Sequence, residues 1–265
     1  MPDDHRNSTK PNGREDHTVK KLPPCYGVIP ARYASSRFEG KPLVLIHGKP
    51  MFWHVYTRAR RCSLLTQITL ATDDQRIFEA AVHHNVPVLM TSDQHRCGTE
   101  RVLEAATMMK VPDHAVIINI QGDEPTLEPD MLFQLIQPFT DSSVQVTTLA
   151  RPITHEEALN PDQVKVVVSG QSDALYFSRS PIPYPRDGEN DGYLGHIGIY
   201  AFRMKTLREY VALDSSVLEK KEKLEQLRLL ENGYNIRVVE TEYVSYGVDR
   251  PEDIALIEEV LSKVE

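Results

Sequence analysis

Residues 27–43 read GVIPARYASSRFEGKPL, and this stretch decides the fold. An apolar run over residues 26–29 leads into a loop that carries Arg32, Arg37 and Lys41. A short apolar run bounded by proline predicts a buried strand. The loop places these cations and several backbone N–H groups at the carboxyl end of the strand, where open α/β sheets bind ligands. The pattern predicts a cradle for a triphosphate, and the alternative is a surface loop with scattered basic residues.

The same loop differs from a P-loop at two positions. A P-loop needs glycine five residues before Gly40, where this chain has Ser35, and serine or threonine after the lysine, where it has Pro42. The missing hydroxyl is the one that a P-loop offers to magnesium. A kinase or ATPase of the P-loop type is therefore disfavoured.

Composition limits the class of protein and its partners. With 265 residues, the chain can form one large α/β domain, or one domain with a small lobe. Its net charge of −8 disfavours nucleic acid as a partner, because no general basic field would attract it. No apolar run approaches the roughly 20 residues that span a bilayer, so no membrane partner is expected.

Cysteine usage and the first residues bear on the compartment. Cys25, Cys62 and Cys97 form no CxxC pair, and their odd number argues against a disulfide framework and a cysteine zinc site. A reducing, cytoplasmic compartment fits best. Residues 1–24 are polar, with charges of both signs and no apolar core of a signal peptide. We expect a disordered leader there, followed by a single domain over residues 25–265.

Apolar runs alternate with helical patterns up to residue 139. Strands are expected at 26–29, 67–71, 86–90 and 115–120, and helices at 51–62, 72–84, 99–109 and 129–139. Thr72 followed by Gln75 predicts a capping box at the start of the second helix. The fold class predicted by this alternation is α/β, with a doubly wound, largely parallel, Rossmann-like sheet.

After residue 144 the pattern changes. Strand-like runs at 144–149, 164–168, 174–177 and 196–202 follow one another with few helices between them. We interpret them as a smaller β-rich lobe within about residues 144–203, beside the main sheet. A long helix over 218–232, a strand over 236–240 and a closing helix over 251–264 complete the prediction.

Two acidic segments are candidates for a metal site. Asp123 lies in QGDEP, residues 121–125, directly after a predicted strand, and magnesium typically uses one or two carboxylates together with phosphate oxygens. A Gly-Asp turn is an equally good interpretation of this pentapeptide. For Asp249, in GVDRPED, a helix cap with Glu252 is the stronger interpretation. An aspartate that caps a helix can still turn one oxygen toward a metal.

Other polar residues give weaker signals. Residues 91–101 could approach a base or ribose, or form a plain strand-to-helix loop. His196 and Tyr200 share one face of a predicted strand, where core side chains are the usual explanation. Glu225 lies on the inner stripe of the predicted helix over 218–232, or else pairs with a lysine on its outer face. Arg179, taken alone, reads as a surface residue.

Nine segments together resemble the 3-deoxy-manno-octulosonate cytidylyltransferases, also called CMP-Kdo synthetases. They occur in the family's order and span about residues 26–262: IPARYASSRFEGKPL, ATDD, TSDQHRCGTER, NIQGDEP, NPDQVKVV, ALYFSRSPIPY, HIGIYAFR, LEQLRLLENGY and GVDRPED. The resemblance implies a fold of the nucleotide-diphospho-sugar transferase type. It also implies transfer of CMP from CTP to the anomeric hydroxyl of 3-deoxy-D-manno-octulosonate (Kdo), for lipopolysaccharide biosynthesis, by a magnesium-dependent homodimer that associates through the β-rich lobe.

The resemblance also implies roles for individual residues. The implied catalytic residues are Lys41, Asp123 and Asp249, of which the two aspartates bind Mg²⁺. The implied nucleotide-binding residues are Ala31, Arg32, Arg37, Lys41, Cys97, Gly98 and Gln121. The implied sugar-binding residues are Gln121, Arg179, His196, Tyr200, Glu225 and Gln226. An ion between the nucleotide and the sugar acid would activate the attacking hydroxyl, so we expect no side-chain base to be essential.

Two positions depart from the family pattern. The family usually has serine where Cys97 stands, and proline where Glu39 stands. We expect Glu39 to point outward, away from the phosphates. The alternatives to a Kdo enzyme are a cytidylyltransferase for another acidic sugar (a nonulosonate or an amino-Kdo), a sugar-1-phosphate pyrophosphorylase, and a non-catalytic nucleotide-binding homologue.

Overall fold

The structure is a computed structural model that describes residues 21–34, 38–188 and 192–264. Arg37 and residues 1–20 of the expected leader lie outside the described residues. The strands are β1 Cys25–Ala31, β2 Leu45–Ile46, β3 Lys49–Pro50, β4 Leu65–Thr72, β5 Val88–Met90, β6 Val116–Asn119, β7 Val146–Ile153, β8 Lys165–Val168, β9 Ala174–Ser178, β10 Tyr193–Arg203 and β11 Ile236–Glu240. The α-helices are α1 Met51–Ala59, α2 Gln75–His83, α3 Gly98–Met108, α4 Pro129–Ile136, α5 His155–Leu159, α6 Met204–Ala212, α7 Val217–Glu222, α8 Leu227–Glu231 and α9 Asp253–Val264.

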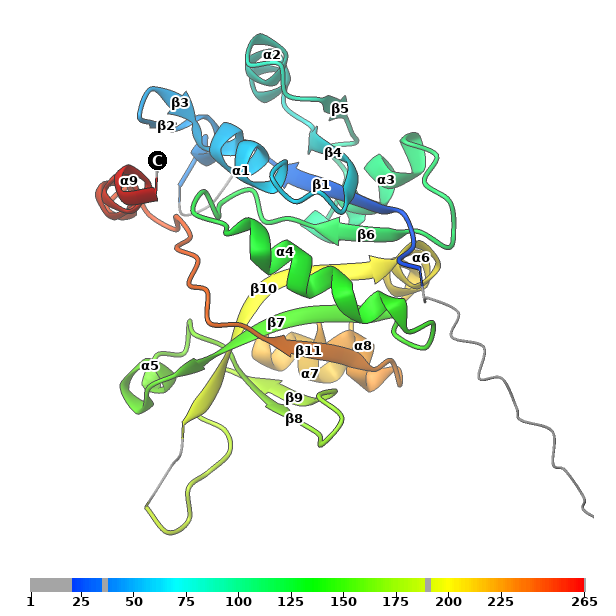
Figure 1. Cartoon of the computed structure of the whole chain (residues 1–265), viewed down its shortest axis with the longest axis vertical. Helices are drawn as coiled ribbons and strands as arrows, with labels where there is room; N and C mark the ends of the chain where they lie inside the picture. The colour runs from blue at the N-terminus through cyan, green and yellow to red at the C-terminus, as the bar shows by residue number, and fades with distance from the viewer. Residues whose placement is uncertain (1–20, 35–37, 189–191, 265) are drawn as a thin grey trace, which may run out of the picture.

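A nine-stranded sheet forms the centre of the molecule, in the order β11-β7-β10-β6-β1-β4-β5, with β8 and β9 attached to β10 (Figure 1). Strand β1 pairs in parallel with β4 and β6, and β11 pairs in parallel with β7. Strand β10 runs antiparallel to both β6 and β7. The predicted doubly wound, largely parallel sheet is confirmed, with β10 and β9 running opposite to the other strands.

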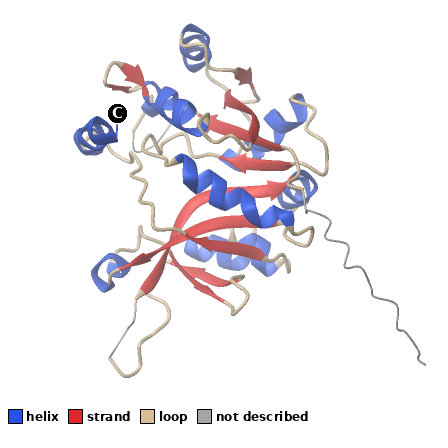
Figure 2. Ribbon diagram, in the orientation of Figure 1, coloured by secondary structure: helices blue, strands red, loops and turns tan. Residues whose placement is uncertain are grey.

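Helices cover both faces of this sheet, as the colouring of Figure 2 shows. Neighbouring residues of β1 point to opposite faces: Ile29 packs in the cluster that contains Phe52 of α1, and Val28 packs in the cluster that contains Val102 of α3. Burial on both faces explains why β1 and β6 read as continuous apolar runs rather than alternating ones. Among the described residues, no helix is long and apolar enough to cross a membrane.

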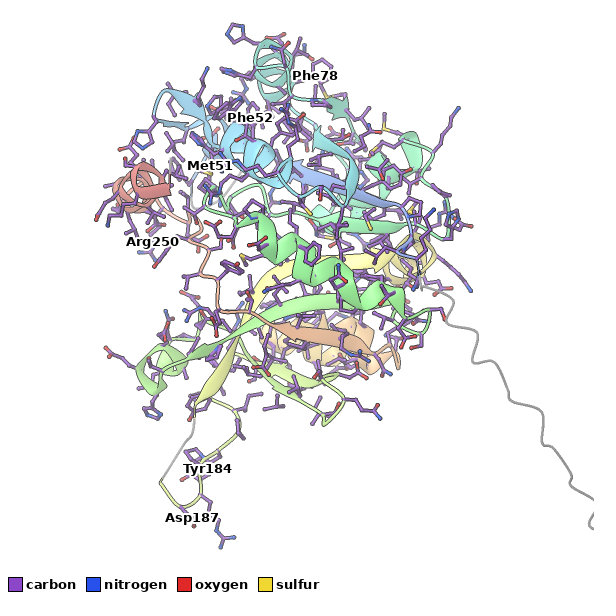
Figure 3. The ribbon with its side chains drawn as sticks, viewed as in Figure 1. Met51, Phe52, Phe78, Tyr184, Asp187 and Arg250 are labelled. Atoms are coloured by element: carbon purple, nitrogen blue, oxygen red, sulfur yellow. The ribbon has the colours of Figure 1, made fainter. Side chains whose placement is uncertain are left out.

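The strands of the predicted β-rich lobe are hydrogen-bonded into the same sheet. Strand β8 pairs with β10 at Leu194 and Gly195, and β9 pairs with β8. Together with α5 they extend the sheet at one end of the molecule (Figure 1). The loop that carries Tyr184 and Asp187 projects from this end into solvent, and Tyr184 is 85% exposed (Figure 3). The lobe is therefore an extension of the central sheet.

The predicted helix over 218–232 is wrong. The chain forms α7 and α8 instead, with Lys223 between them at φ 55°. The two short helices are held against each other by a buried ion pair between Glu219 and Arg228. A continuous helix would keep these side chains a fixed nine residues apart along one axis, so their pairing requires the break. Glu225 consequently lies in the break and not on a helical stripe.

Smaller differences concern helix starts. Helix α2 begins at Gln75 and is capped by Asp74, whose carboxylate accepts hydrogen bonds from the backbone N–H groups of Arg76 and Ile77. The predicted Thr72 cap is therefore wrong. Aspartate is at least as good an N-cap as threonine, and Asp74 lies two residues closer to the first helical turn than Thr72 does. Helix α6, which follows β10 directly, was not predicted from the sequence.

Candidate active site

The loop after β1 returns to the sheet edge and lines a cavity of about 220 Å³. Gly40, in a left-handed conformation (φ 70°), donates its backbone N–H to the Tyr33 carbonyl at 2.9 Å and closes the loop. This closure directs the Lys41 side chain back toward the ends of β1 and β6. The cavity is lined by Pro30, Ala31, Arg32, Lys41, Pro42, His95, Cys97, Gly98, Arg101, Gln121, Gly122 and Asp123. Glu39 is exposed, as expected.

Lys41 connects the two acidic segments. Its Nζ donates to Asp123 Oδ2 at 2.6 Å and to the Val248 carbonyl at 2.8 Å. The ion pair is partly sheltered, since 14% of the lysine side chain and 37% of the aspartate side chain are exposed. One ammonium group thus holds the end of β6 against the residue that precedes Asp249.

The segments 121–127 and 243–249 lie side by side. The Val248 N–H donates to the Asp123 carbonyl at 2.9 Å. The Tyr246 N–H donates to Thr126 Oγ1 at 2.7 Å. These contacts bring together the two segments that carry Asp123 and Asp249, the predicted metal ligands. The predicted cap partner Glu252 is wrong: the Asp253 carboxylate accepts from the N–H groups of Asp249 and Arg250, both at 2.8 Å.

The donor set suits a hard divalent cation held jointly with a substrate. Within the described ranges, no group of three or more histidine, cysteine, aspartate or glutamate side chains could hold a metal alone. Two carboxylates completed by phosphate oxygens are, however, the usual set for magnesium. Asp123 and Asp249 place negative charge beside Glu124. The pKa of Glu124 is raised, first by burial and then by these two carboxylates. Asp123 and Asp249 thus fit the predicted ion.

A second cavity, of about 180 Å³, adjoins the first and shares Gly98 and Gln121 with it. Its lining comprises Gly98, Thr99, Asn119, Gln121, Tyr200, Phe202, Tyr210, Glu225, Gln226 and Leu229. Gln121 is fixed at the junction, because its Nε2 donates to the Gly198 carbonyl at 2.8 Å. The two cavities therefore meet at Gly98 and Gln121, and Lys41 and Asp123 line the first of them.

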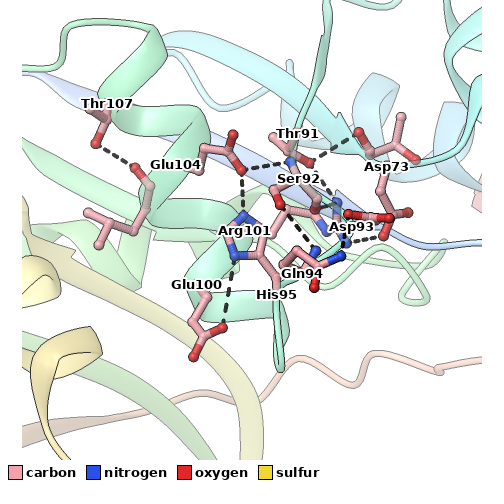
Figure 4. A network of polar contacts seen from close by, with 12 residues as sticks. Asp73, Thr91, Ser92, Asp93, Gln94, His95, Glu100, Arg101, Glu104 and Thr107 are labelled. Atoms are coloured by element: carbon pink, nitrogen blue, oxygen red, sulfur yellow. Dashed lines mark hydrogen bonds and ion pairs between the residues drawn. The ribbon is translucent and has the colours of Figure 1, made fainter.

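A polar network fixes the segment that leads into α3 (Figure 4). Arg101 is 4% exposed and donates to Thr91 Oγ1 at 2.6 Å and to Asp73 Oδ2 at 2.5 Å. His95 bonds to Glu104 across the same segment. Sequence reasoning did not single out Arg101 or His95, although both line the first cavity. A basic residue in the first turn of a helix opposes the helix dipole, and this could have indicated that Arg101 has acidic partners.

Not all predicted sugar-binding residues reach the second cavity. Tyr200, Glu225, Gln226 and Gln121 line it, whereas His196 lies behind Tyr200, at 5.4 Å between ring centroids, and bonds to Thr148. Burial lowers the pKa of His196 to about 3, so its imidazole is neutral at physiological pH.

Arg179 is engaged outside the second cavity. Its guanidinium donates to the Glu222 carbonyl at 2.7 Å and to the Pro161 carbonyl at 2.9 Å. These bonds tie the end of α7, and therefore the break that carries Glu225, to the β-rich lobe. In this chain Arg179 holds the rim of the site and does not line its cavity.

Gly122 allows the Asp123 segment to approach β1. A Cβ at this position would lie 2.8 Å from the Pro30 carbonyl oxygen, which belongs to the backbone and cannot swing away. We expect Gly122→Ala to displace Asp123 and to lower kcat/KM roughly 100-fold, the usual effect of an ångström-scale misplacement. Gly170→Ala is the control, since nothing lies within 4 Å of its Cβ. Steady-state kinetics check the prediction, and equal rates for both variants would contradict it.

Cys97 occupies the N-cap of α3 without making a side-chain cap bond. Burial raises the pKa of its thiol, so the group is a neutral, weak acceptor. Cys97→Ser supplies the missing acceptor, and we expect the free energy of unfolding to rise by about 1 kcal/mol. Urea titration measures this change. Cys62→Ser is the matched control and should lower stability, because Cys62 is buried in the core.

A family model described as Cytidylyltransferase matches residues 26–239. The chain is 61% identical, over 88% of its length and 94% of the relative's, to a protein of Nitratidesulfovibrio vulgaris strain Hildenborough named 3-deoxy-manno-octulosonate cytidylyltransferase. A protein of Lawsonia intracellularis with the same name is 54% identical over 91% of this chain and 95% of its own.

Two solved structures have folds similar to that of this chain. A CMP:2-keto-3-deoxy-manno-octonic acid synthetase complexed with CTP superposes with a TM-score of 0.87 at 43% identity, over 91% of this chain and 100% of that one. A glucose-1-phosphate thymidylyltransferase from Bacillus anthracis, at 14% identity, has a TM-score of 0.65 over 91% of this chain and 96% of its own. The second likeness concerns the fold alone.

Proposed function

This chain belongs to the cytidylyltransferase family, and from its place among the 3-deoxy-manno-octulosonate cytidylyltransferases we infer that it transfers CMP from CTP to Kdo and releases pyrophosphate. The product is the activated sugar for lipopolysaccharide synthesis. One observation carries the mechanism: Lys41 is bonded to Asp123 and Val248, and Lys41 and Asp123 line the first cavity, which meets the second at Gln121. Charge that develops on a transferred phosphate would face this ammonium group.

Mg²⁺ is the proposed cofactor, with Asp123 and Asp249 as its protein ligands. When bound, it supplies charge neutralisation between two anionic substrates and lowers the pKa of a nearby hydroxyl. Arg32 and Lys41 would bind the triphosphate in the first cavity, and Gln121 would orient the groups at the junction. The neutral His196 bonds to Thr148 and lines neither cavity, so it is not placed to act as a general base. Positioning and charge would therefore do most of the catalysis.

Pyrophosphate release tests this function. The purified chain is assayed with magnesium and Kdo, using CTP, UTP and ATP in parallel, and then with CTP and a panel of other sugars. We expect turnover with CTP and Kdo. Turnover only with a nonulosonate or an amino-Kdo would identify another acidic-sugar enzyme. Turnover only with sugar 1-phosphates would identify a pyrophosphorylase, and CTP binding without turnover would identify a non-catalytic homologue.

We propose a homodimer formed through the β-rich lobe. Large apolar side chains are exposed there on three different elements: Leu159 of α5, Leu175 of β9 and Tyr184 of the projecting loop, at 60%, 62% and 85%. These elements gather at one end of the molecule (Figure 1). Light scattering after size exclusion should give twice the chain mass, and Leu175→Glu should lower it to the monomer mass. A monomeric wild-type protein would overturn the proposal.

We also propose that the enzyme works in the cytoplasm. The three cysteines are free thiols, and burial raises the pKa of Cys25 to about 12, which keeps it unreactive. Such thiols persist in a reducing compartment. Fractionation of cells that express the tagged chain measures its location directly.

A further inference from the structure

Asn119 is a buried amide at the end of an apolar strand. It closes β6, whose other residues Val116, Ile117 and Ile118 are fully buried, and is itself 5% exposed. Its Oδ1 atom is buried and has no hydrogen-bond partner in the described part of the chain. The side chain lines the second cavity. The resemblance assigned Asn119 no role, and in the sequence it reads as part of an apolar run.

An unpaired amide oxygen at this depth is costly unless a ligand completes it. Buried polar groups in native proteins nearly always have partners, and an exception beside a cavity is explained by a water, an ion or a ligand that binds there. A second such group lies beside it: Tyr200 is directly opposite Asn119 in the β6–β10 pairing, and its buried hydroxyl also lacks a partner among described residues. Both residues line one cavity, so two unpaired polar atoms lie at its floor.

The surroundings select the kind of ligand group. Glu225 lines the same cavity, so a substrate carboxylate would meet negative charge there. A hydroxyl group can donate to the Asn119 oxygen and accept from other groups at once, and it carries no charge. The polyol portion of a sugar acid therefore suits the floor of this cavity, with its carboxylate turned toward the junction and Lys41.

We propose that Asn119 is a specificity-determining residue that hydrogen-bonds a hydroxyl group of the sugar acid at the floor of the second cavity. The proposal rests on the proposed function and adds to it a residue and a recognised group. Sites built to bond a hydroxyl reject analogues that lack it, because their own polar atoms are then left unpaired. The enzyme should therefore discriminate against a Kdo analogue that lacks the hydroxyl in question.

Two variants test the proposal in steady-state kinetics. Asn119→Leu keeps the branched shape of the side chain without its polar atoms, and Asn119→Ala removes the side chain beyond Cβ. We expect both to lower kcat/KM for Kdo at saturating CTP roughly 10- to 100-fold, with KM for CTP changed less than twofold. In the absence of substrates, Asn119→Leu should be at least as stable to urea as the wild type, because an unpaired amide is removed. A merely structural asparagine would instead lose stability and affect both substrates equally.

Ile117→Val is the matched control, because Ile117 is on the same face of the same strand and is not itself a lining residue of the cavity. It should change stability and leave kcat/KM for Kdo unaltered. Monodeoxy analogues of Kdo then identify the hydroxyl that Asn119 bonds. The wild type should turn over one analogue more slowly than Kdo, whereas Asn119→Ala should turn over that analogue and Kdo at equal rates. If, for every analogue, the loss of rate from the missing hydroxyl adds to the loss from Asn119→Ala, the proposal is overturned. No turnover by the wild type would instead refute the proposed function itself.

Discussion

Asp123→Asn should lower kcat by roughly 1,000-fold or more, because it removes charge at the centre of a site that works by electrostatic positioning. The amide has the same shape as the carboxylate and its oxygen can still accept from Lys41. What disappears is the negative charge that pairs with Lys41 at 2.6 Å and that would bind magnesium. Kinetics at varied magnesium measure the loss, and excess magnesium should not restore the rate.

A second measurement separates a lost charge from a damaged fold. The stabilisation of the wild type by CTP with magnesium, followed by thermal unfolding, should shrink in Asp123→Asn, while the unfolding midpoint without ligands should not change. The control is Asp113→Asn, which removes a carboxylate from an exposed ion pair with Arg208. Near-full turnover of Asp123→Asn with magnesium would show that the proposed metal role is wrong.

Lys41→Met should be nearly as damaging. The substitution keeps the length and apolar stem of the side chain, but the ammonium that bonds Asp123 and the Val248 carbonyl is lost. We expect kcat/KM for CTP to fall roughly 1,000-fold, the scale seen when one charged or hydrogen-bonding group of a transition-state site is removed. Lys41→Arg should recover little, because a planar guanidinium does not fit the place of a compact ammonium.

Stability distinguishes this effect from misfolding. The Asp123 side chain is 37% exposed, so water replaces most of the lost ion pair, and the free energy of unfolding should fall by less than about 1 kcal/mol. Urea titration checks this. Lys49→Met, at an exposed lysine near α1, is the matched control and should keep full activity. A Lys41→Met enzyme with normal kcat/KM for CTP would remove Lys41 from the mechanism.

The fold was largely predictable because its signals are local. A continuous apolar run predicts a strand buried on both faces, and the runs that contain β1 and β6 obey this closely. The same reasoning failed at α7 and α8. There the apolar spacing favours one helix, whereas the contacts of Arg228 with Glu219 and of Arg179 with Glu222 hold the broken form.

The candidate site, like the fold, was predictable from the sequence only in part. The sequence by itself determined that Lys41 and Asp123 follow buried strands of one parallel sheet, and parallel strands bring their carboxyl ends to one edge. Tertiary structure alone decided that Lys41 bonds Val248, that Arg179 bonds the end of α7, and that Asn119 Oδ1 has no partner among the described residues. The reason is physical: periodicity reports which face of an element is buried, whereas these contacts depend on how distant elements pack against one another.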